Sequence, residues 1–365
     1  MERPFETASK VPNVVVLNAT TRKHCSMETI STVGLELAKS IFQVHAISES
    51  DKPLVRRTLR RSQVLEVFGK LPPCIIGMEA CGSAHHWARE IAALGHDVRL
   101  MPPVYVKACV KRSKADAADA EAICEAVTRP TMRFAPIKSV EQQAAGMVLK
   151  ARELLLRQRS QAADALRGHM AELGLVAAMG MANIGKLIAV IRSDGDHIAP
   201  TALKGIATQI EALTVRIEKL ERNVIVTVKD DEEARRLTSI PGVGPIIAGT
   251  VKAVVQDPKG FRSGRDFSAW LGLTPRANSS GGKERLGSIS KRGNKQLRTL
   301  LIVGATSVIK QAKRGLPVPN WIVTLLARRP YKVVAVALAN KIARTIWALL
   351  VKGEAYKTPP AMAKA

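Results

Sequence analysis

The sequence predicts an α/β part followed by a mainly α-helical remainder. Short strand-like runs open the patterned region and then alternate with helices, which is typical of mixed layers of sheet and helix. Residues 139–225 instead show helical periodicity, with few helix breakers outside 168–205. In the last third, residues 295–310 and 331–352 are predicted to form helices with an apolar face. We therefore expect an α/β domain over 31–136, a helical segment over 137–230 and a helical domain over 231–352, between an N-terminal extension (1–30, expected to be disordered) and a tail (353–365).

The first patterned element is a strand pair. Thr32–Ala38 and Ile41–Ser48 flank the polar Lys39–Ser40, which suits a tight hairpin, and Pro53–Arg60 alternates apolar and basic residues as a third strand. Upstream of these strands, Met27 is an alternative start to Met1. Downstream, the pattern predicts a helix over 62–69, a strand over 74–78, a helix over 83–94, a strand over 97–101 and a helix from about residue 115.

Acidic residues mark the ends of these elements. Asp116 and Asp119 are three residues apart and lie on one helical face, where two carboxylates repel each other unless a cation lies between them. Glu36 lies in the first strand and Glu79 ends a later one. Carboxylates from separate elements can converge on Mg²⁺ beside a phosphodiester. The alternative is an acidic helix start favoured by the macrodipole, with Glu79 as a strand-end cap.

The helical segment is predicted to fold back on itself. Residues 140–173 read as one long amphipathic helix, and residues 206–226 return with Ile210, Leu213, Ile217 and Leu220 on one stripe. This pattern predicts an antiparallel hairpin or coiled coil that either spaces two domains or pairs two chains. A plain helical core fits the same pattern.

The net charge of +25 implies a polyanionic partner. Because aromatic residues make up only 4% of the chain, phosphate contacts by Lys and Arg are favoured over base stacking. Residues 231–365 contain 24 Lys and Arg against 7 Asp and Glu. Basic side chains at Lys111, Arg112 and Lys114 also precede Asp116 directly.

Two segments of the basic third are candidates for phosphate contact. The turn over 239–245 opens a helix with Gly242 and Gly244 and is similar to a helix-hairpin-helix turn, although a tight helix entry explains it equally well. The loop over 278–285 places Ser279 and Ser280 beside two glycines, where cations favour an activated hydroxyl; an ordinary flexible loop is the alternative. The cations of this region are Arg276, Lys283, Arg285, Lys291, Arg292 and Lys295.

Neither a signal peptide nor a membrane span is predicted. Residues 173–191 are interrupted by Lys186, and residues 333–351 contain Asn340, Lys341 and Arg344. Five cysteines without a C-x-x-C pair indicate reduced thiols in the cytoplasm.

Several of these motifs occur together, in this order, in one known group. Gly77–Gly82, the Lys114–Asp119 run and Trp270–Arg276, followed by Ser279–Lys283, resemble the transposases of bacterial insertion-sequence family one-ten, particularly its eleven-eleven branch. The related Piv DNA invertases share the layout. The resemblance covers about residues 31–350.

The resemblance implies an RNase H-like (RuvC-like) N-terminal domain with a D-E-D-D metal site, a coiled-coil linker and a C-terminal transposase domain with a catalytic serine. Glu79, Asp116 and Asp119 match the last three acids, and Ser280 matches the nucleophile, with Ser279 as runner-up. The implied cofactor is Mg²⁺ or Mn²⁺. The implied partners are double-stranded DNA (element ends and target) and a structured RNA encoded by the element, bound by a dimeric or tetrameric protein.

The first acid departs from the family pattern, because Glu36 stands where the family has Asp. Glu keeps the charge, but its extra methylene moves the carboxylate, and Mg²⁺ tolerates poor geometry badly. Three functions therefore stay open. They are a transposase that works through a phosphoserine intermediate, a metal-dependent junction nuclease that uses water, and a decayed, non-catalytic nucleic-acid-binding relative.

Overall fold

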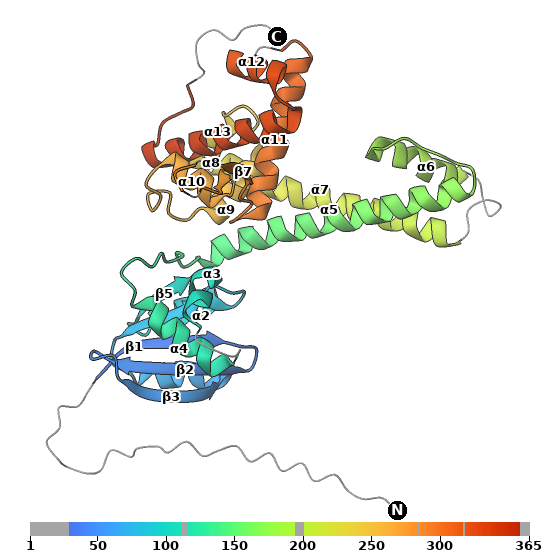
Figure 1. Ribbon diagram of the computed structural model, residues 1–365. Helices are drawn as coiled ribbons and strands as arrows, with labels where there is room; N and C mark the ends of the chain where they lie inside the picture. Colours follow the sequence, from blue (N-terminus) through green and yellow to red (C-terminus); the bar gives the residue numbers. More distant parts are fainter. Residues whose placement is uncertain are drawn as a thin grey trace, which may run out of the picture. The chain divides into compact units, whose positions relative to one another are not determined.

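The computed structural model describes residues 29–110, 115–193, 201–279, 281–283, 285–316 and 318–357. The chain forms two compact units, with the boundary between Ser139 and Val140. Figure 1 shows a sheet with helices in the first unit and helices almost throughout the second. The predicted α/β part and mainly helical remainder are thus confirmed. The predicted N-terminal extension and most of the predicted tail lie outside the described residues.

The first unit is built on one five-stranded sheet of order β3-β2-β1-β4-β5. β1, β2 and β3 are antiparallel, whereas β4 and β5 run parallel to β1. The strands are β1 (Ile30–Leu37), β2 (Ile41–Ser48), β3 (Pro53–Arg60), β4 (Ile75–Glu79) and β5 (Asp97–Met101). The helices are α1 (Val64–Gly69), α2 (Ala84–Ala92), α3 (Pro103–Val106) and α4 (Asp116–Val127), with short 3₁₀ turns at Arg61–Gln63 and Lys107–Cys109.

Each face of this sheet buries a separate core, because successive side chains along a strand point to opposite faces. Leu35 and Met78 pack with Trp87 of α2 in one cluster. The opposite face is covered by α4, whose Ile123 and Val127 pack in a second cluster with residues of α3. The predicted strands and helices of this unit are confirmed to within a few residues, and Gly95, with φ of 96°, follows α2 as expected of a glycine after a helix.

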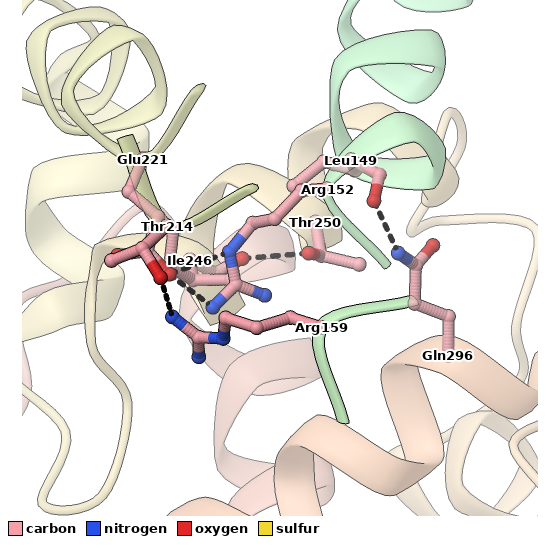
Figure 2. A network of polar contacts seen from close by, with 8 residues as sticks. All are labelled: Leu149, Arg152, Arg159, Thr214, Glu221, Ile246, Thr250 and Gln296. Atoms are coloured by element: carbon pink, nitrogen blue, oxygen red, sulfur yellow. Dashed lines mark hydrogen bonds and ion pairs between the residues drawn. The ribbon is translucent and has the colours of Figure 1, made fainter. Parts of the chain in front are cut away.

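The second unit begins with a helical arm made of α5 (Val140–Glu172), α6 (Met181–Ser193) and α7 (Thr201–Asp230). Arg152 of α5 pairs with Glu221 of α7, and Arg159 donates to Thr214 (Figure 2). Because the partner's number falls as the number along α5 rises, α5 and α7 are antiparallel, as the hairpin prediction required. Whether they form a true coiled coil stays a prediction.

The remaining helices surround the largest core of the molecule. They are α8 (Glu232–Thr238), α9 (Pro245–Val254), α10 (Gly264–Trp270), α11 (Lys295–Lys313), α12 (Asn320–Arg328) and α13 (Tyr331–Lys352). The Nε2 of Gln296 on α11 donates to the carbonyl of Leu149 on α5 (3.0 Å), which ties the arm to this core (Figure 2). The arm and the C-terminal helices thus form one unit, and the expected division near residue 230 stays a prediction.

Several elements of this unit differ from the prediction. β6 (Pro275–Ala277) and β7 (Leu286–Ile289) form a small antiparallel hairpin on either side of the predicted loop over 278–285. The two strands were not predicted, because short exposed strands carry no apolar alternation. α12 was not predicted as a separate helix. α10 was not predicted either; it begins at Gly264, where the Ser263 side chain caps it by accepting from the Asp266 N–H.

Helix α13 is long and apolar enough to cross a membrane by length and composition alone. Its apolar face is buried in the core of the second unit, with residues such as Val334, Leu338 and Ile342 less than 9% exposed. α13 therefore contributes to this core, and the absence of a membrane span over residues 333–351 stays a prediction.

Candidate functional site

Two predicted site residues lie at the carboxyl ends of neighbouring parallel strands, Glu36 next to the last residue of β1 and Glu79 as the last residue of β4. In the register of β1 and β4, Leu35 lies opposite Met78, and Glu36 and Glu79 follow these two residues directly. The carboxyl ends of parallel strands meet at one edge of a sheet. The two glutamates therefore lie at the same edge of the sheet, although they are 43 positions apart in the sequence.

A pair of glycines brings α4 close to the same strands. Gly34 lies opposite Gly77 in the register. A Cβ added at Gly34 would lie 2.2 Å from the carbonyl oxygen of Ala120, and one added at Gly77 would lie 2.8 Å from the Cβ of Val127. Only glycine therefore allows α4 to pack this closely against β1 and β4. The sequence signal for this close packing is a glycine two residues before each glutamate, on the same face of its strand.

The first turn of α4 supplies the two aspartates. Ala115 is extended, and the helix begins at Asp116 with Asp116 and Asp119 in its first turn. The positive end of the helix macrodipole favours carboxylates there. Because Glu36 lies two residues beyond Gly34 on the face that α4 covers, the glutamates and aspartates lie on the same side of the sheet.

The pKa of Glu36 is affected by the charges of the other three acids. Burial raises the pKa of Glu36 to about 7, and the charges of Glu79, Asp119 and Asp116 add to this shift. Burial also raises the pKa of Glu79, followed by the charge of Asp119. Each carboxylate thus lies within electrostatic reach of at least one other, which is the arrangement that opposes ionisation unless a cation is added.

The four carboxylates suit a hard divalent cation in their chemistry, since such ions take oxygen ligands. Among the described residues, however, no three His, Cys, Asp or Glu side chains are grouped closely enough to hold a metal ion as they stand. The acids therefore share one electrostatic neighbourhood without forming a closed set of ligands. The assignment of Glu36, Glu79, Asp116 and Asp119 as metal ligands stays a prediction.

The serine loop is the tip of the β6–β7 hairpin. The Asn278 N–H donates to the Arg285 carbonyl (2.8 Å), and the Ser279 hydroxyl accepts from the Arg285 N–H (3.3 Å). The Ser279 oxygen thus helps to close the hairpin. Ser280, the predicted nucleophile, lies outside the described residues.

A buried arginine holds the base of this hairpin, and sequence reasoning missed it. Arg298 of α11 is only 7% exposed, and its guanidinium donates to the carbonyls of Leu271 and Arg292 (2.8 Å each). The two backbone segments that Arg298 joins are in close contact at Gly293, because a Cβ added there would lie 1.8 Å from the carbonyl oxygen of Trp270. The only sequence signal for this role of Arg298 was its basic side chain at a core position of the predicted helix that begins at Lys295.

The predicted phosphate-contacting residues fall into three groups. Six are exposed around the hairpin, namely Arg276, Lys283, Arg285, Lys291, Arg292 and Lys295. Gly244 is also exposed, whereas Gly242, with φ of 86°, packs its backbone against Gly304 of α11. Lys111, Arg112 and Lys114 lie outside the described residues.

Comparison with family models matches both parts of the site. Residues 33–174 match the model of DEDD transposases of the IS110 type, described as a transposase. Residues 234–316 match the model described as the transposase IS116/IS110/IS902 family. The first match contains Glu36, Glu79, Asp116 and Asp119, and the second contains the β6–β7 hairpin.

Similar proteins cover nearly the whole chain. A putative transposase of Sinorhizobium fredii is 44% identical over 94% of this chain and 89% of its own length. A probable family 20 transposase of Pseudomonas aeruginosa is 46% identical over 90% of this chain and 99% of its own. The transposase for insertion sequence element IS1111A of Coxiella burnetii is 38% identical over 92% of this chain and 94% of its own.

Proposed function

Since the chain belongs to the IS110/IS1111 family of insertion-sequence transposases, we propose that it exchanges DNA strands of such an element through a covalent link between DNA and a serine. The observation that supports this proposal is that Glu36 of β1 lies within electrostatic range of Glu79 of β4 and of the two aspartates of α4, whose charges raise its pKa further after burial. The net charge of +25 supports a nucleic-acid substrate.

We assign the first unit to the RNase H-like (RuvC-like) class. Three antiparallel strands followed by two strands parallel to the first, in the order β3-β2-β1-β4-β5, support the assignment. α4 covers one face of this sheet and presents its acidic first turn on the side of Glu36.

In the proposed reaction, Glu36, Glu79, Asp116 and Asp119 would hold Mg²⁺ or Mn²⁺. When bound, such an ion neutralises the charge that develops on the phosphate oxygens. The Ser280 hydroxyl oxygen forms a bond to phosphorus while one bond between phosphorus and a deoxyribose oxygen breaks, and the serine proton ends on the leaving oxygen. The number of phosphate ester bonds is unchanged, so attack by a new strand restores DNA without ATP.

The cations around the hairpin are assigned to the scissile phosphate and its neighbours. Arg276 lies on β6, Lys283 and Arg285 lie in the loop between β6 and β7, and all three are exposed to a partner. Positive side chains placed where phosphate charge develops lower the barrier of phosphoryl transfer. The partners that complete the proposal are an element-encoded structured RNA and further copies of the chain, as a dimer or tetramer.

The test is the covalent adduct. The purified full-length protein is incubated with labelled DNA carrying element ends, with Mg²⁺, and the products are run on a denaturing gel with and without protease. We expect a protease-sensitive adduct that disappears in Ser280→Ala and persists in Ser279→Ala, its matched neighbour. An adduct lost only in Ser279→Ala would move the nucleophile by one residue. Strand cleavage without any adduct would instead indicate the nuclease that uses water.

One observation favours a second candidate, a decayed relative without catalysis. Glu36 replaces the Asp of the family pattern, and the described side chains do not form a closed set of metal ligands. Glu36→Asp shortens the carboxylate and tests this directly. If the parent is inactive and Glu36→Asp gains metal-dependent adduct formation, the machinery is intact apart from this position. Inactivity of both would support the decayed relative.

A further inference from the structure

A second basic surface of the C-terminal helices lies apart from the serine hairpin. It is a pocket of about 940 Å³ between the start of α10, the helix α12 and the middle of α13. This volume is within the range of roughly 300–1,000 Å³ typical of ligand sites. Its lining includes the cations Arg265, Lys341 and Arg344, the indoles Trp321 and Trp347, and Asn340.

The charge of this pocket is uncompensated. Its lining contains three cations and no acid, and among the described residues none of the three forms an ion pair. The chain has no Asp or Glu between Glu284 and Glu354. Like charges held together without a counter-ion cost free energy, which an anionic ligand would recover.

Close packing of α10 on α13 sets the cations side by side. A Cβ added at Gly264 would lie 3.1 Å from the carbonyl oxygen of Arg344, so the first turn of α10 rests on the backbone of α13. Arg265 therefore follows directly after the point of contact with Arg344. Lys341 lies one turn earlier on the same helix, at the spacing that puts two side chains on one face.

The aromatic content of the pocket is unusual for this chain. The chain has only four tryptophans, and two of them line this one surface. The indole N–H of Trp347 donates to the Pro258 carbonyl (2.9 Å), which fixes its ring. The Nζ of Lys341 lies 4.9 Å from the centre of the Trp321 ring. Trp321 and Trp347 are both only partly buried, so each ring keeps some exposed surface.

Basic side chains interleaved with aromatic rings are the features that hold unpaired nucleic-acid strands, since cations follow the phosphates and bases stack on rings. A duplex offers its phosphates but keeps its bases stacked on one another. The side-chain N–H of Asn340 donates to the Leu273 carbonyl (3.2 Å), and this bond fixes the direction of the amide oxygen. Leu273 in turn lies two residues before the serine hairpin begins at Pro275.

We propose that this pocket binds an unpaired segment of a nucleic-acid strand, with a base against Trp321 and phosphates on Lys341, Arg344 and Arg265. Lys341 moves from the Trp321 ring to a phosphate as the base enters. The site is separate from the acids of the first unit and from the cations of the serine hairpin, so it adds a contact for an unpaired strand to the proposed function.

The test measures strand binding by the full-length protein, using fluorescence anisotropy with labelled oligothymidylate, oligouridylate and a duplex, each of about 20 nucleotides. The charge variant is Lys341→Gln/Arg344→Gln. The matched control, Arg328→Gln/Lys332→Gln, removes two exposed cations of α12 and α13 outside the pocket. For a single strand, log affinity falls with log salt concentration. We expect this slope to be shallower by about 1.4 in the charge variant than in the control, because two phosphate contacts are removed.

The ring variants separate stacking from charge. Trp321→Leu keeps an apolar side chain against the core and should weaken single-strand binding roughly tenfold, whereas Trp321→Phe keeps a ring and should lose less than about threefold. Duplex binding should change little in either. The single strand that is bound more tightly, oligothymidylate or oligouridylate, assigns the source as DNA or RNA.

Two results would overturn the proposal. One is single-strand binding by Lys341→Gln/Arg344→Gln that matches the control at every salt concentration. The other is a Trp321→Leu protein that melts at the parent temperature yet binds single strands as tightly as the parent does. Because neither measurement needs strand exchange, failure here leaves the serine mechanism untouched, and the reverse also holds.

Discussion

At the scale of single residues, Glu36 combines burial with three like charges. Its pKa of about 7 lies above the ordinary value of 4.5, so the folded protein holds a proton that the unfolded chain has released between these two pH values. Its contribution to the free energy of unfolding is therefore complete below pH 4.5 and is lost as the pH rises through 7. In the metal-free protein, the contribution of Glu36 to the free energy of unfolding is therefore smaller in neutral and basic solution than in acidic solution.

The first prediction follows from this decrease in stability with rising pH. Glu36→Gln removes the charge that opposes its neighbours, so the metal-free variant should be more stable than the parent at pH 8, by about 1 kcal/mol after allowing for partial exposure, and similar to it at pH 4. Thermal unfolding at the two pH values measures the difference. Mg²⁺ at pH 8 should raise the melting temperature of the parent more than that of the variant. Glu66→Gln is the control, because Lys70 lowers the pKa of the exposed Glu66, and it should gain nothing at pH 8.

The second residue-scale prediction concerns Arg298. Arg298→Met keeps the length of the side chain but leaves the carbonyls of Leu271 and Arg292 without their donor, which should cost about 3 kcal/mol in the free energy of unfolding. Amide hydrogen exchange should also accelerate over residues 271–293. Lys310→Met, on an exposed position of α11, is the control. Equal urea midpoints for the two variants would show that Arg298 does not hold the hairpin base.

At the scale of elements, the position of α4 decides whether the four acids meet. Gly34→Ala would force a Cβ to within 2.2 Å of the Ala120 carbonyl, so α4 must move away from β1. We expect a loss of about 3 kcal/mol in the free energy of unfolding, at the upper end for overpacking, together with easier proteolysis in α4. Gly146 lies inside α5, where an added Cβ would meet no atom within 4 Å. Gly146→Ala should therefore be neutral or should raise the free energy of unfolding by up to about 1 kcal/mol. A Gly34→Ala protein as stable as Gly146→Ala would contradict this account of the site.

At the scale of the whole molecule, the cores and the charge are divided unequally between the two units. Each of the four apolar clusters draws its residues from one unit alone. Residues 140–365 contain 36 Lys and Arg against 17 Asp and Glu, whereas residues 1–139 contain 20 against 14. The second unit therefore carries most of the excess positive charge.

The whole-molecule prediction is that the units fold and bind separately. Fragments 29–139 and 140–357 should each unfold cooperatively, because each has its own buried core. The second fragment should bind DNA with a steep dependence on salt, and the first should bind weakly at about 0.15 M salt. Filter binding across a salt series gives both slopes. A first fragment that binds as tightly as the second would show that excess charge is not what attracts the nucleic acid.

Much of the fold was predictable because local patterns suffice for it. The strands over 41–48, 53–60 and 97–101 and the long helices that begin at Val140 and Tyr331 follow from alternation and helical spacing. The short exposed strands β6 and β7 were missed because they bury nothing, and α12 because its nine residues lie among prolines and arginines without a clear start. The acids were found from their residue types and spacing, whereas Gly34, Gly77 and Arg298 act through neighbours far along the chain.

The amino-acid sequence by itself determined the element types, the acidic positions, the excess positive charge and the resemblance to one transposase family, because these depend on residue identity and on spacing over a few turns. Only the tertiary structure decided that β4 pairs with β1 so that Glu36 and Glu79 emerge together, that two glycines admit α4 against them, and that Arg265, Trp321 and Lys341 line one pocket. Such contacts join residues dozens of positions apart, and they depend on how side chains and backbones fit in three dimensions rather than on any local period.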